Sequence, residues 1–263
     1  MDNTPDPHSE AFRVALQAQI ASQREEAVDL LSELVAVPSL LGQEQPAQDL
    51  MRREFERNAL EVHEFEIDEA RIRDHPGYSP SLISYQGRRN VVGIHRPRGP
   101  VRGRSLILNG HIDVVPIGAQ QLWSRPPFSP TVIGDRLYGR GAADMKAGLV
   151  AFTLAHRALR RMGLAPAAPV YLQSVVEEEC TGNGALACLV EGYTADAALI
   201  PEPIPGIMTG QMGVMWVTLD ILGLPVHAAR AYTGVNAIGF AQHLVEHFRQ
   251  WEAACTEPAA PHQ

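Results

Sequence analysis

The chain has 263 residues, 45% of them apolar and 20% charged, which is enough for one sizeable core, or for one domain and part of another. Its net charge of −8 argues against a nucleic-acid-binding surface, because phosphate contacts need clustered Lys and Arg. The polar start has no signal-peptide pattern, no apolar run reaches the ~18 residues that would span a bilayer, and the three cysteines are too few for a disulfide framework, so we expect a cytoplasmic protein.

The first part of the chain predicts a tail, two helices and two short strands. Residues 1–9 are polar and acidic, and we expect a disordered tail there. Apolar residues at helical spacing predict one long amphipathic helix over 10–37, which Pro38 ends. The elements expected next, in chain order, are a helix over 46–59, a strand over 62–67, a loop over 74–80 and a strand over 90–94.

A His and an Asp stand where the next apolar strand, which begins at Ser105, gives way to a loop. Side chains alternate along a strand, so His111 and Asp113 should point the same way. An imidazole beside a carboxylate suits a metal ligand whose ring is oriented by an acid. The alternative is a structural hydrogen-bonded pair.

Two further acidic positions follow. Asp144 lies between glycine-rich turns and an apolar helical run over 149–159, so it should lie near a helix start, as a site residue or as an ordinary N-cap. The strand over 170–176 ends in Glu177, Glu178 and Glu179. Adjacent carboxylates repel one another unless water or a cation screens them, which indicates either a metal or a solvated acidic loop.

The strand over 197–200 is followed by Glu202 between two prolines. Strands and helices alternate up to residue 207, which predicts an α/β fold with a mixed, mostly parallel sheet and helices on both faces. An open sheet of this kind gathers its site at the carboxyl ends of its strands. We therefore expect the acidic and imidazole side chains at these ends to converge.

The pattern changes near residue 208. An alternating run over 214–223 predicts a long strand, His227 lies in the loop after it, and an amphipathic helix runs to about Trp251. This segment predicts the beginning of a second, smaller unit.

Four motifs, taken in order, carry a resemblance to a known family. They are Gly-His-Ile-Asp-Val-Val-Pro (110–116), Gly-Arg-Gly-Ala-Ala-Asp-Met-Lys-Ala-Gly (139–148), Glu-Glu-Glu-Cys-Thr-Gly-Asn-Gly (177–184) and Pro-Glu-Pro (201–203). From about residue 20 onward the chain resembles the di-zinc metallopeptidases that include acetylornithine deacetylase, succinyl-diaminopimelate desuccinylase and carboxypeptidase G.

The resemblance implies a zinc-peptidase-like catalytic domain over 10–207 and the beginning of a smaller α+β lid and dimerisation domain over 208–263. Members of the family continue well beyond this length and supply one more metal-binding His. Both domains are therefore expected to be incomplete in this chain, and whether it is active as it stands is left open.

The resemblance also implies a role for each site residue. Two divalent cations, zinc first and cobalt or manganese as alternatives, would be held by His111, Asp144, Glu179 and Glu202, with Asp144 bridging them and a cis peptide bond after it. Asp113 would orient His111 or tune the base, Glu178 would be the general base, and His227 would stabilise the oxyanion, usually in the partner subunit. A register shifted by one would make Glu177 the base and Glu178 the ligand.

The activity implied is hydrolysis of an N-acyl amino acid or related small amide to a carboxylate and a free amine. The partners expected are that small substrate and a second copy of the chain in a homodimer, with no nucleic acid and no membrane. Two alternatives stay open. One is an aminopeptidase, dipeptidase or carboxypeptidase of the same fold, and the other is a non-catalytic fragment that binds metal or dimerises.

Overall fold

The structure is a computed structural model that describes residues 6, 9–204, 206–208 and 217–255. The chain divides into two compact units, Met1–Pro205 and Gly206–Gln263, and each is described by itself. The tail expected over 1–9 falls almost entirely outside the described residues.

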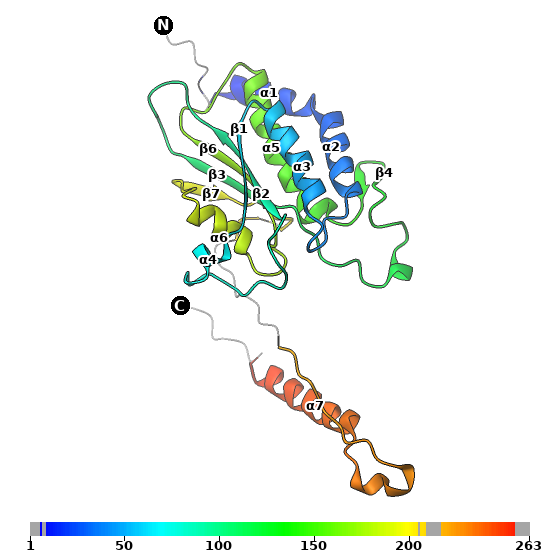
Figure 1. Ribbon diagram of the computed structural model, residues 1–263. Coiled ribbons are helices and arrows are strands. Elements are labelled where there is room, and N and C mark those ends of the chain that lie inside the picture. The colour runs from blue at the N-terminus through cyan, green and yellow to red at the C-terminus, as the bar shows by residue number, and fades with distance from the viewer. Residues whose placement is uncertain (1–5, 7–8, 205, 209–216, 256–263) are drawn as a thin grey trace. The chain divides into compact units, whose positions relative to one another are not determined.

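The first unit is built on a five-stranded mixed sheet with the order β1-β2-β6-β3-β7 (Figure 1). β3 pairs in parallel with β6 and β7, whereas β2 runs antiparallel to both β6 and β1. Four of the five strands thus run in one direction, which confirms the predicted mixed, mostly parallel sheet. The strands are β1 (Glu61–Glu66), β2 (Arg89–His95), β3 (Leu106–His111), β6 (Val170–Val175) and β7 (Ala197–Leu199).

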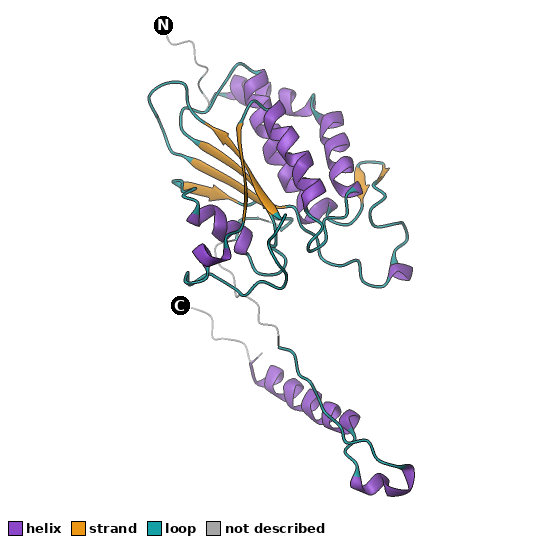
Figure 2. Ribbon diagram, in the orientation of Figure 1, coloured by secondary structure: helices purple, strands orange, loops and turns teal. Residues whose placement is uncertain are grey.

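Helices cover both faces of this sheet (Figure 2). On one face α3 and α5 lie directly on the strands, and α1 and α2 pack against α5. On the other side α6 packs near β6 and contacts the short α4. The helices are α1 (Glu10–Ala21), α2 (Arg24–Ala36), α3 (Gln45–Arg57), α4 (Glu69–Ile72), α5 (Ala147–Arg161) and α6 (Asn183–Val190).

The alternation of side chains along β6 fills two cores. Val170 and Leu172 belong to the larger core, which includes residues of α2, α3 and α5. Val175 points the other way, into a smaller core with Val92 and with Cys188 of α6. Because successive strand residues face opposite sides, an almost continuous apolar run is needed for a sheet buried on both faces.

The single helix expected over 10–37 is wrong, because the structure has two helices separated at Ser22 and Gln23. Gln23 is buried, and its side-chain amide donates a hydrogen bond to the backbone oxygen of Leu154 in α5, 3.3 Å away. The apolar spacing is helical on both sides of this break, so periodicity alone carries no sign of it. A contact across 131 positions accompanies the change of direction.

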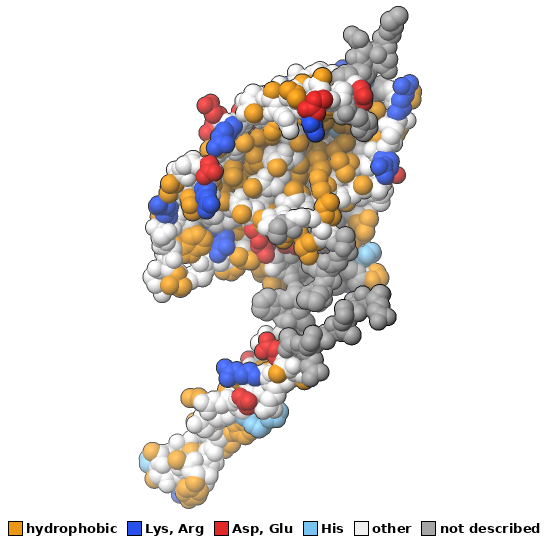
Figure 3. Space-filling view, turned by 180° about the vertical axis from the view of Figure 1, so that it is seen from behind, with side chains coloured by type: hydrophobic (Ala, Val, Ile, Leu, Met, Phe, Trp, Pro, Cys, Tyr) orange, Lys and Arg blue, Asp and Glu red, His pale blue; other side chains and the backbone are white. Residues whose placement is uncertain are grey.

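A hairpin and an apolar groove complete the first unit. The hairpin joins β4 (Thr131–Ile133) to β5 (Arg136–Tyr138), and the turn before it holds η1 (Gln120–Leu122). A groove of about 760 Å³ lies between α1, α2, α5 and this hairpin, and its lining contains none of the predicted site residues. Hydrophobic side chains also gather in the middle of the face that Figure 3 presents, with charged ones around its margin.

The second unit contains η3 (Ala228–Thr233) and α7 (Ala237–Cys255). Residues 214–216 of the strand expected over 214–223 lie outside the described residues, and 217–223 form neither a strand nor a helix. The β-pairing in the described part of this unit is one isolated antiparallel bridge between Leu224 and Val235. A strand needs a neighbouring strand to satisfy its backbone hydrogen bonds, so the alternating pattern by itself does not make one. None of the described helices combines the length and hydropathy needed to cross a membrane.

Candidate metal centre

The carboxyl ends of three neighbouring strands position most of the candidate site. His111 is the last residue of β3, Glu178 and Glu179 follow β6, and Glu202 follows β7. Asp144 lies in the turn just before α5. Parallel strands end at the same edge of a sheet, which brings side chains together that are far apart in the sequence.

His111 is the centre of this arrangement. Its side chain is 1% exposed, and Nδ1 lies 2.9 Å from the backbone oxygen of Asp113. Nε2 lies 3.2 Å from Oδ1 of Asp144, 3.8 Å from Oε2 of Glu178 and 3.8 Å from Oε1 of Glu202. When Nδ1–H donates to the Asp113 carbonyl, the lone pair of Nε2 faces three carboxylates, which is the tautomer a metal ligand needs.

The Asp113 carboxylate lies between the two groups that its predicted role concerns, the His111 ring and the turn that carries Glu178. Its Oδ1 lies 3.6 Å from Nδ1 of His111, so the backbone carbonyl makes the close contact with the ring. The carboxylate instead accepts the backbone N–H groups of Glu178 and Glu179, at 3.2 and 3.1 Å. Asp113 therefore holds both the imidazole and the acidic turn in place.

The Asp144 turn is fixed to the end of α2 by Lys146. The Lys146 ammonium is fully buried and donates hydrogen bonds to the backbone oxygens of Leu34 (2.7 Å) and Val37 (3.0 Å). Burial lowers the pKa of Lys146 to about 8, although the Asp113 carboxylate opposes this shift. The peptide bond between Asp144 and Met145 is cis, as the resemblance implied.

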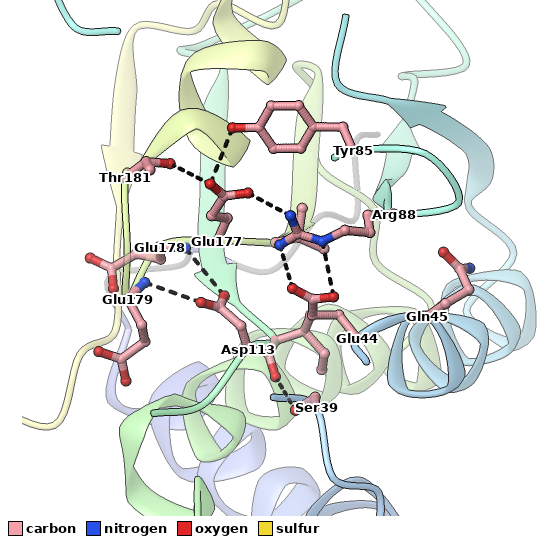
Figure 4. A network of polar contacts seen from close by, with 12 residues as sticks. Ser39, Glu44, Gln45, Tyr85, Arg88, Asp113, Glu177, Glu178, Glu179 and Thr181 are labelled. Carbon is pink, nitrogen blue, oxygen red and sulfur yellow. Dashed lines mark hydrogen bonds and ion pairs between the residues drawn. The ribbon is translucent and has the colours of Figure 1, made fainter. Parts of the chain in front are cut away.

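The three adjacent glutamates occupy two different environments. Glu177 is fully buried and has a φ of 66°, a left-handed conformation that costs a residue with a side chain about 1–2 kcal/mol. Figure 4 shows its carboxylate pointing toward Arg88 and Tyr85, whereas the side chains of Glu178 and Glu179 leave on the opposite side. The glutamate of the three whose carboxylate lies within 4 Å of His111 is thus Glu178, whereas Glu177 is turned away.

The cluster has perturbed electrostatics. Burial raises the pKa of Glu202 to about 7, and the carboxylates of Asp144 and Glu178 add to the rise while His111 opposes it. Burial also raises the pKa of Asp113 and of Glu179 above their usual ranges. For His111, burial lowers the pKa, but the carboxylates of Asp113 and Glu178 outweigh it and the pKa lies above its usual value.

The donor set fits a divalent cation. One ligand atom each from His111, Asp144 and Glu202 lies within 4.8 Å of the other two. Mixed imidazole and carboxylate ligands are accepted by zinc, manganese and cobalt alike. Within the described part of the chain, the Glu179 carboxylate has no hydrogen bond or ion pair with these three side chains, so the predicted role of Glu179 stays a prediction.

His227 belongs to the second unit. Its Nδ1 accepts a hydrogen bond from the backbone N–H of Ala229 at 3.2 Å, and the residue caps η3. Its side chain is exposed. The predicted role at the site stays a prediction.

Sequence reasoning missed four buried residues whose hydrogen bonds hold the acidic turn and the Asp144 turn in place, namely Glu44, Tyr85, Arg88 and Lys146. Arg88 stands just before β2, where a charge next to a buried strand is unremarkable. Its contacts reach back 44 positions to Glu44 and forward 89 positions to Glu177. No spacing rule covers such distances, so only coordinates reveal this group.

Residues 107–257 match the sequence profile described as peptidase family M20/M25/M40. N-formyl-4-amino-5-aminomethyl-2-methylpyrimidine deformylase from Halalkalibacterium halodurans is 30% identical over 94% of this chain and 58% of its own length. A probable succinyl-diaminopimelate desuccinylase from Staphylococcus aureus is 36% identical over 58% of this chain and 37% of its own. The chain thus spans little more than half the length of the first of these relatives.

Two solved structures show the same fold. Human carnosine dipeptidase 1 superposes with a TM-score of 0.54 at 20% identity, over 71% of this chain and 40% of its own. A tripeptidase from Staphylococcus aureus superposes with a TM-score of 0.54 at 20% identity, over 84% of this chain and 56% of its own. At this identity the likeness concerns the fold alone.

Proposed function

This chain belongs to peptidase family M20/M25/M40, and we propose that the protein is a metal-dependent deacylase. Its substrate would be an N-acyl amino acid or a related small amide, cleaved to a carboxylate and a free amine. The observation that carries the proposal is the buried His111, whose Nε2 faces the carboxylates of Asp144, Glu178 and Glu202 within 3.8 Å.

The centre would hold a pair of divalent cations, zinc first and cobalt or manganese as alternatives, and the group of His111, Asp144 and Glu202 supports a site for one of them. His111 and Glu202 would hold one cation, Glu179 would bind the other, and Asp144 would bridge the two. Cations bound there would polarise the amide carbonyl and acidify a water molecule.

The side chains of the chain itself would move the proton. Glu178 would take it from the attacking water and return it to the departing amine nitrogen, as a general base that then acts as an acid. The burial and contacts of Glu177 favour this register over the one in which Glu177 is the base, because a carboxylate bound by Arg88 and turned inward is poorly placed to meet a substrate. Asp113 would orient His111 through its carbonyl, and His227 would stabilise the oxyanion.

A deacylase is favoured over a peptidase by the relatives with higher identity. The deformylase and the probable desuccinylase are 30% and 36% identical to this chain. The dipeptidase and tripeptidase structures are 20% identical and bear on the fold alone. Turnover of a series of N-formyl, N-acetyl and N-succinyl amino acids, measured beside unblocked dipeptides, separates the two classes.

The proposal extends to the partners of the whole protein. They are a small N-acyl amino acid or peptide and a second copy of the chain, joined through the unit that begins near residue 206. Sedimentation of the purified protein across a range of concentrations tests the homodimer.

The general-base role is tested by Glu178→Gln. This change keeps the size of the side chain but removes its ability to accept a proton, so kcat should fall about 10²–10⁴-fold. Metal content per chain should stay at the wild-type value, and Glu33→Gln, an exposed site on α2, should leave both unchanged. Undiminished turnover of Glu178→Gln would remove Glu178 from the mechanism.

The metal site itself is tested without any turnover. Cobalt titration followed by its absorption should show binding to the wild-type chain and none to His111→Ala, because that change removes the imidazole at the centre of the cluster. Equal cobalt binding by both proteins would contradict the proposed metal centre.

A further inference from the structure

Glu177 is an inward anchor at the start of the acidic turn. Its Oε1 accepts hydrogen bonds from the hydroxyl of Tyr85 (3.2 Å) and the hydroxyl of Thr181 (3.1 Å), and its Oε2 accepts one from Arg88 (2.8 Å). Its backbone oxygen accepts the N–H groups of Thr181 and Gly182, at 3.1 and 3.0 Å. Hydrogen bonds therefore hold both the carboxylate and the backbone oxygen of Glu177. They explain how a positive φ is maintained in a residue with a side chain.

Arg88 ties this anchor to α3. Its guanidinium is 5% exposed and binds Glu44 with two hydrogen bonds, from Nε to Oε2 at 3.2 Å and from the second terminal nitrogen to Oε1 at 2.5 Å. Burial lowers the pKa of Arg88, but the contacts with Glu44 and Glu177 outweigh it and raise that pKa, so the side chain stays cationic. One buried cation is thus shared by two fully buried carboxylates.

The anchor decides where the next two residues lie. With Glu177 held on one side, the N–H groups of Glu178 and Glu179 point at the Asp113 carboxylate, and their side chains leave on the side opposite to Glu177 (Figure 4). The Glu178 carboxylate there lies 3.8 Å from Nε2 of His111. If Arg88 were removed, two buried carboxylates would lose their shared cation, and one of them would have to move or take up a proton. Glu177 is the one attached to a strained turn, so the turn should be the part that moves.

We propose that Arg88 is a positioning residue, which acts through Glu177 to fix the turn that presents Glu178 and Glu179 to the metal centre. The effect of Arg88 on metal binding rests on the proposed function, whereas its effect on the position of the turn does not. The ion pairs of Arg88 are with Glu44 and Glu177, neither of which is among the proposed metal ligands.

Native-state amide exchange tests the link to the turn without metal or turnover. Arg88→Met should speed exchange of the Glu178 and Glu179 amides about tenfold or more, since their hydrogen bonds to Asp113 open when the anchor loosens. The amide of Leu172, in the middle of β6, reports global unfolding and serves as the internal reference.

The matched control is Arg157→Met. Arg157 is a second largely buried arginine, which binds Glu54, Glu26 and Asn58 at 2.6, 3.1 and 2.9 Å, away from the acidic turn. Its loss should lower stability comparably but leave the ratio of turn exchange to Leu172 exchange within about twofold of wild type. If Arg88→Met changes this ratio no more than Arg157→Met does, Arg88 is merely structural and the proposal is overturned.

A milder variant covers the case in which Arg88→Met does not fold. Thr181→Val keeps the shape of the side chain and removes its hydrogen bond to Glu177, together with the one that its hydroxyl accepts from the backbone N–H of Asn183. It should speed exchange at Glu178 and Glu179 by about threefold, with Leu172 unchanged. Unaltered exchange in Thr181→Val would also overturn the proposal.

Cobalt affinity tests the link to the metal centre. Arg88→Met should bind cobalt about tenfold more weakly than wild type, the loss typical of residues that support ligands, whereas Arg157→Met should not. The effect should disappear in a Glu179→Ala background, because Arg88 would then have no ligand to position; persistence there would overturn the route through the acidic pair. If wild type binds no cobalt, the proposed function fails, and the exchange measurements still decide the positioning role.

Discussion

His156 shows at the scale of one residue how burial sets a pH dependence. It lies on α5, is 4% exposed, and neither ring nitrogen has a hydrogen-bond partner in the described structure. Burial lowers its pKa from 6.5 to about 4, and the nearby His95 and Arg160 add to the effect. Between pH 6.5 and about pH 4, His156 is therefore mostly protonated in the unfolded chain and mostly neutral in the folded one.

The sign of the resulting stability change follows from linkage. Because the pKa is lower in the folded state, the free energy of unfolding should fall as the pH drops from 6.5 toward 4, by about 1–2 kcal/mol at pH 5. His156→Phe removes the titrating group, so its unfolding free energy should change less between pH 7 and pH 5 than that of wild type. Chemical denaturation at both pH values measures the difference, and parallel profiles would contradict the assignment.

Lys146 is the only lysine in the sequence, and it is fully buried. An amine-reactive reagent should therefore modify the N-terminus of the native protein quickly and Lys146 only when the Asp144 turn opens or the chain unfolds. Mass spectrometry after brief labelling at pH 8.5, with and without urea, measures both sites in one sample. Equal labelling of the two amines in the absence of urea would show that Lys146 is accessible and that the turn is not fixed to α2.

The approach of α6 to β6 is an element-scale constraint that depends on one glycine. A Cβ added to Gly184 would lie 2.0 Å from the backbone oxygen of Val176, and a backbone atom cannot be moved aside as a flexible side chain can. Val176 immediately precedes Glu177, so this contact lies next to the acidic turn. Small residues of this kind let a helix begin close against a strand end.

Gly184→Ala should accordingly lower the free energy of unfolding by about 2–4 kcal/mol, the range of a forced backbone shift in a packed region. Gly99→Ala is the matched control, because a Cβ there meets nothing within 4 Å. Urea denaturation compares the two variants. A Gly184→Ala protein as stable as Gly99→Ala would mean that α6 is free to move away from β6.

The whole chain should respond to cations through mass action. A ligand that binds only the folded state stabilises it by about 2.7 kcal/mol at one hundred times its Kd, which corresponds to a rise in Tm of about 5–10 °C for a chain of this size. Thermal unfolding with and without cobalt should show this rise, and a chelator should reverse it. His111→Ala should show none, and an equal rise in that variant would place the bound cation elsewhere.

Much of the fold and the outline of the candidate site could be predicted from sequence, because the relevant signals are local. The apolar run that forms β6 and the helical spacing in α5 each lie within one short segment. His111, Asp144 and Glu202 stand at element ends that such patterns locate. The rule that parallel strands end at one edge brings His111 and Glu202 together, and Asp144 joins them from the turn before α5, as the structure shows.

The tertiary structure decided the features that depend on contacts between residues far apart in the sequence. The break between α1 and α2 accompanies a contact of Gln23 with Leu154, and the inward turn of Glu177 depends on Arg88, 89 positions away. Three adjacent glutamates are chemically identical in a sequence, and only the structure separates the buried Glu177 from Glu178, which lies 3.8 Å from His111, and from Glu179. Local pattern determined which side chains reach the sheet edge, whereas packing between distant segments decided which way each one points.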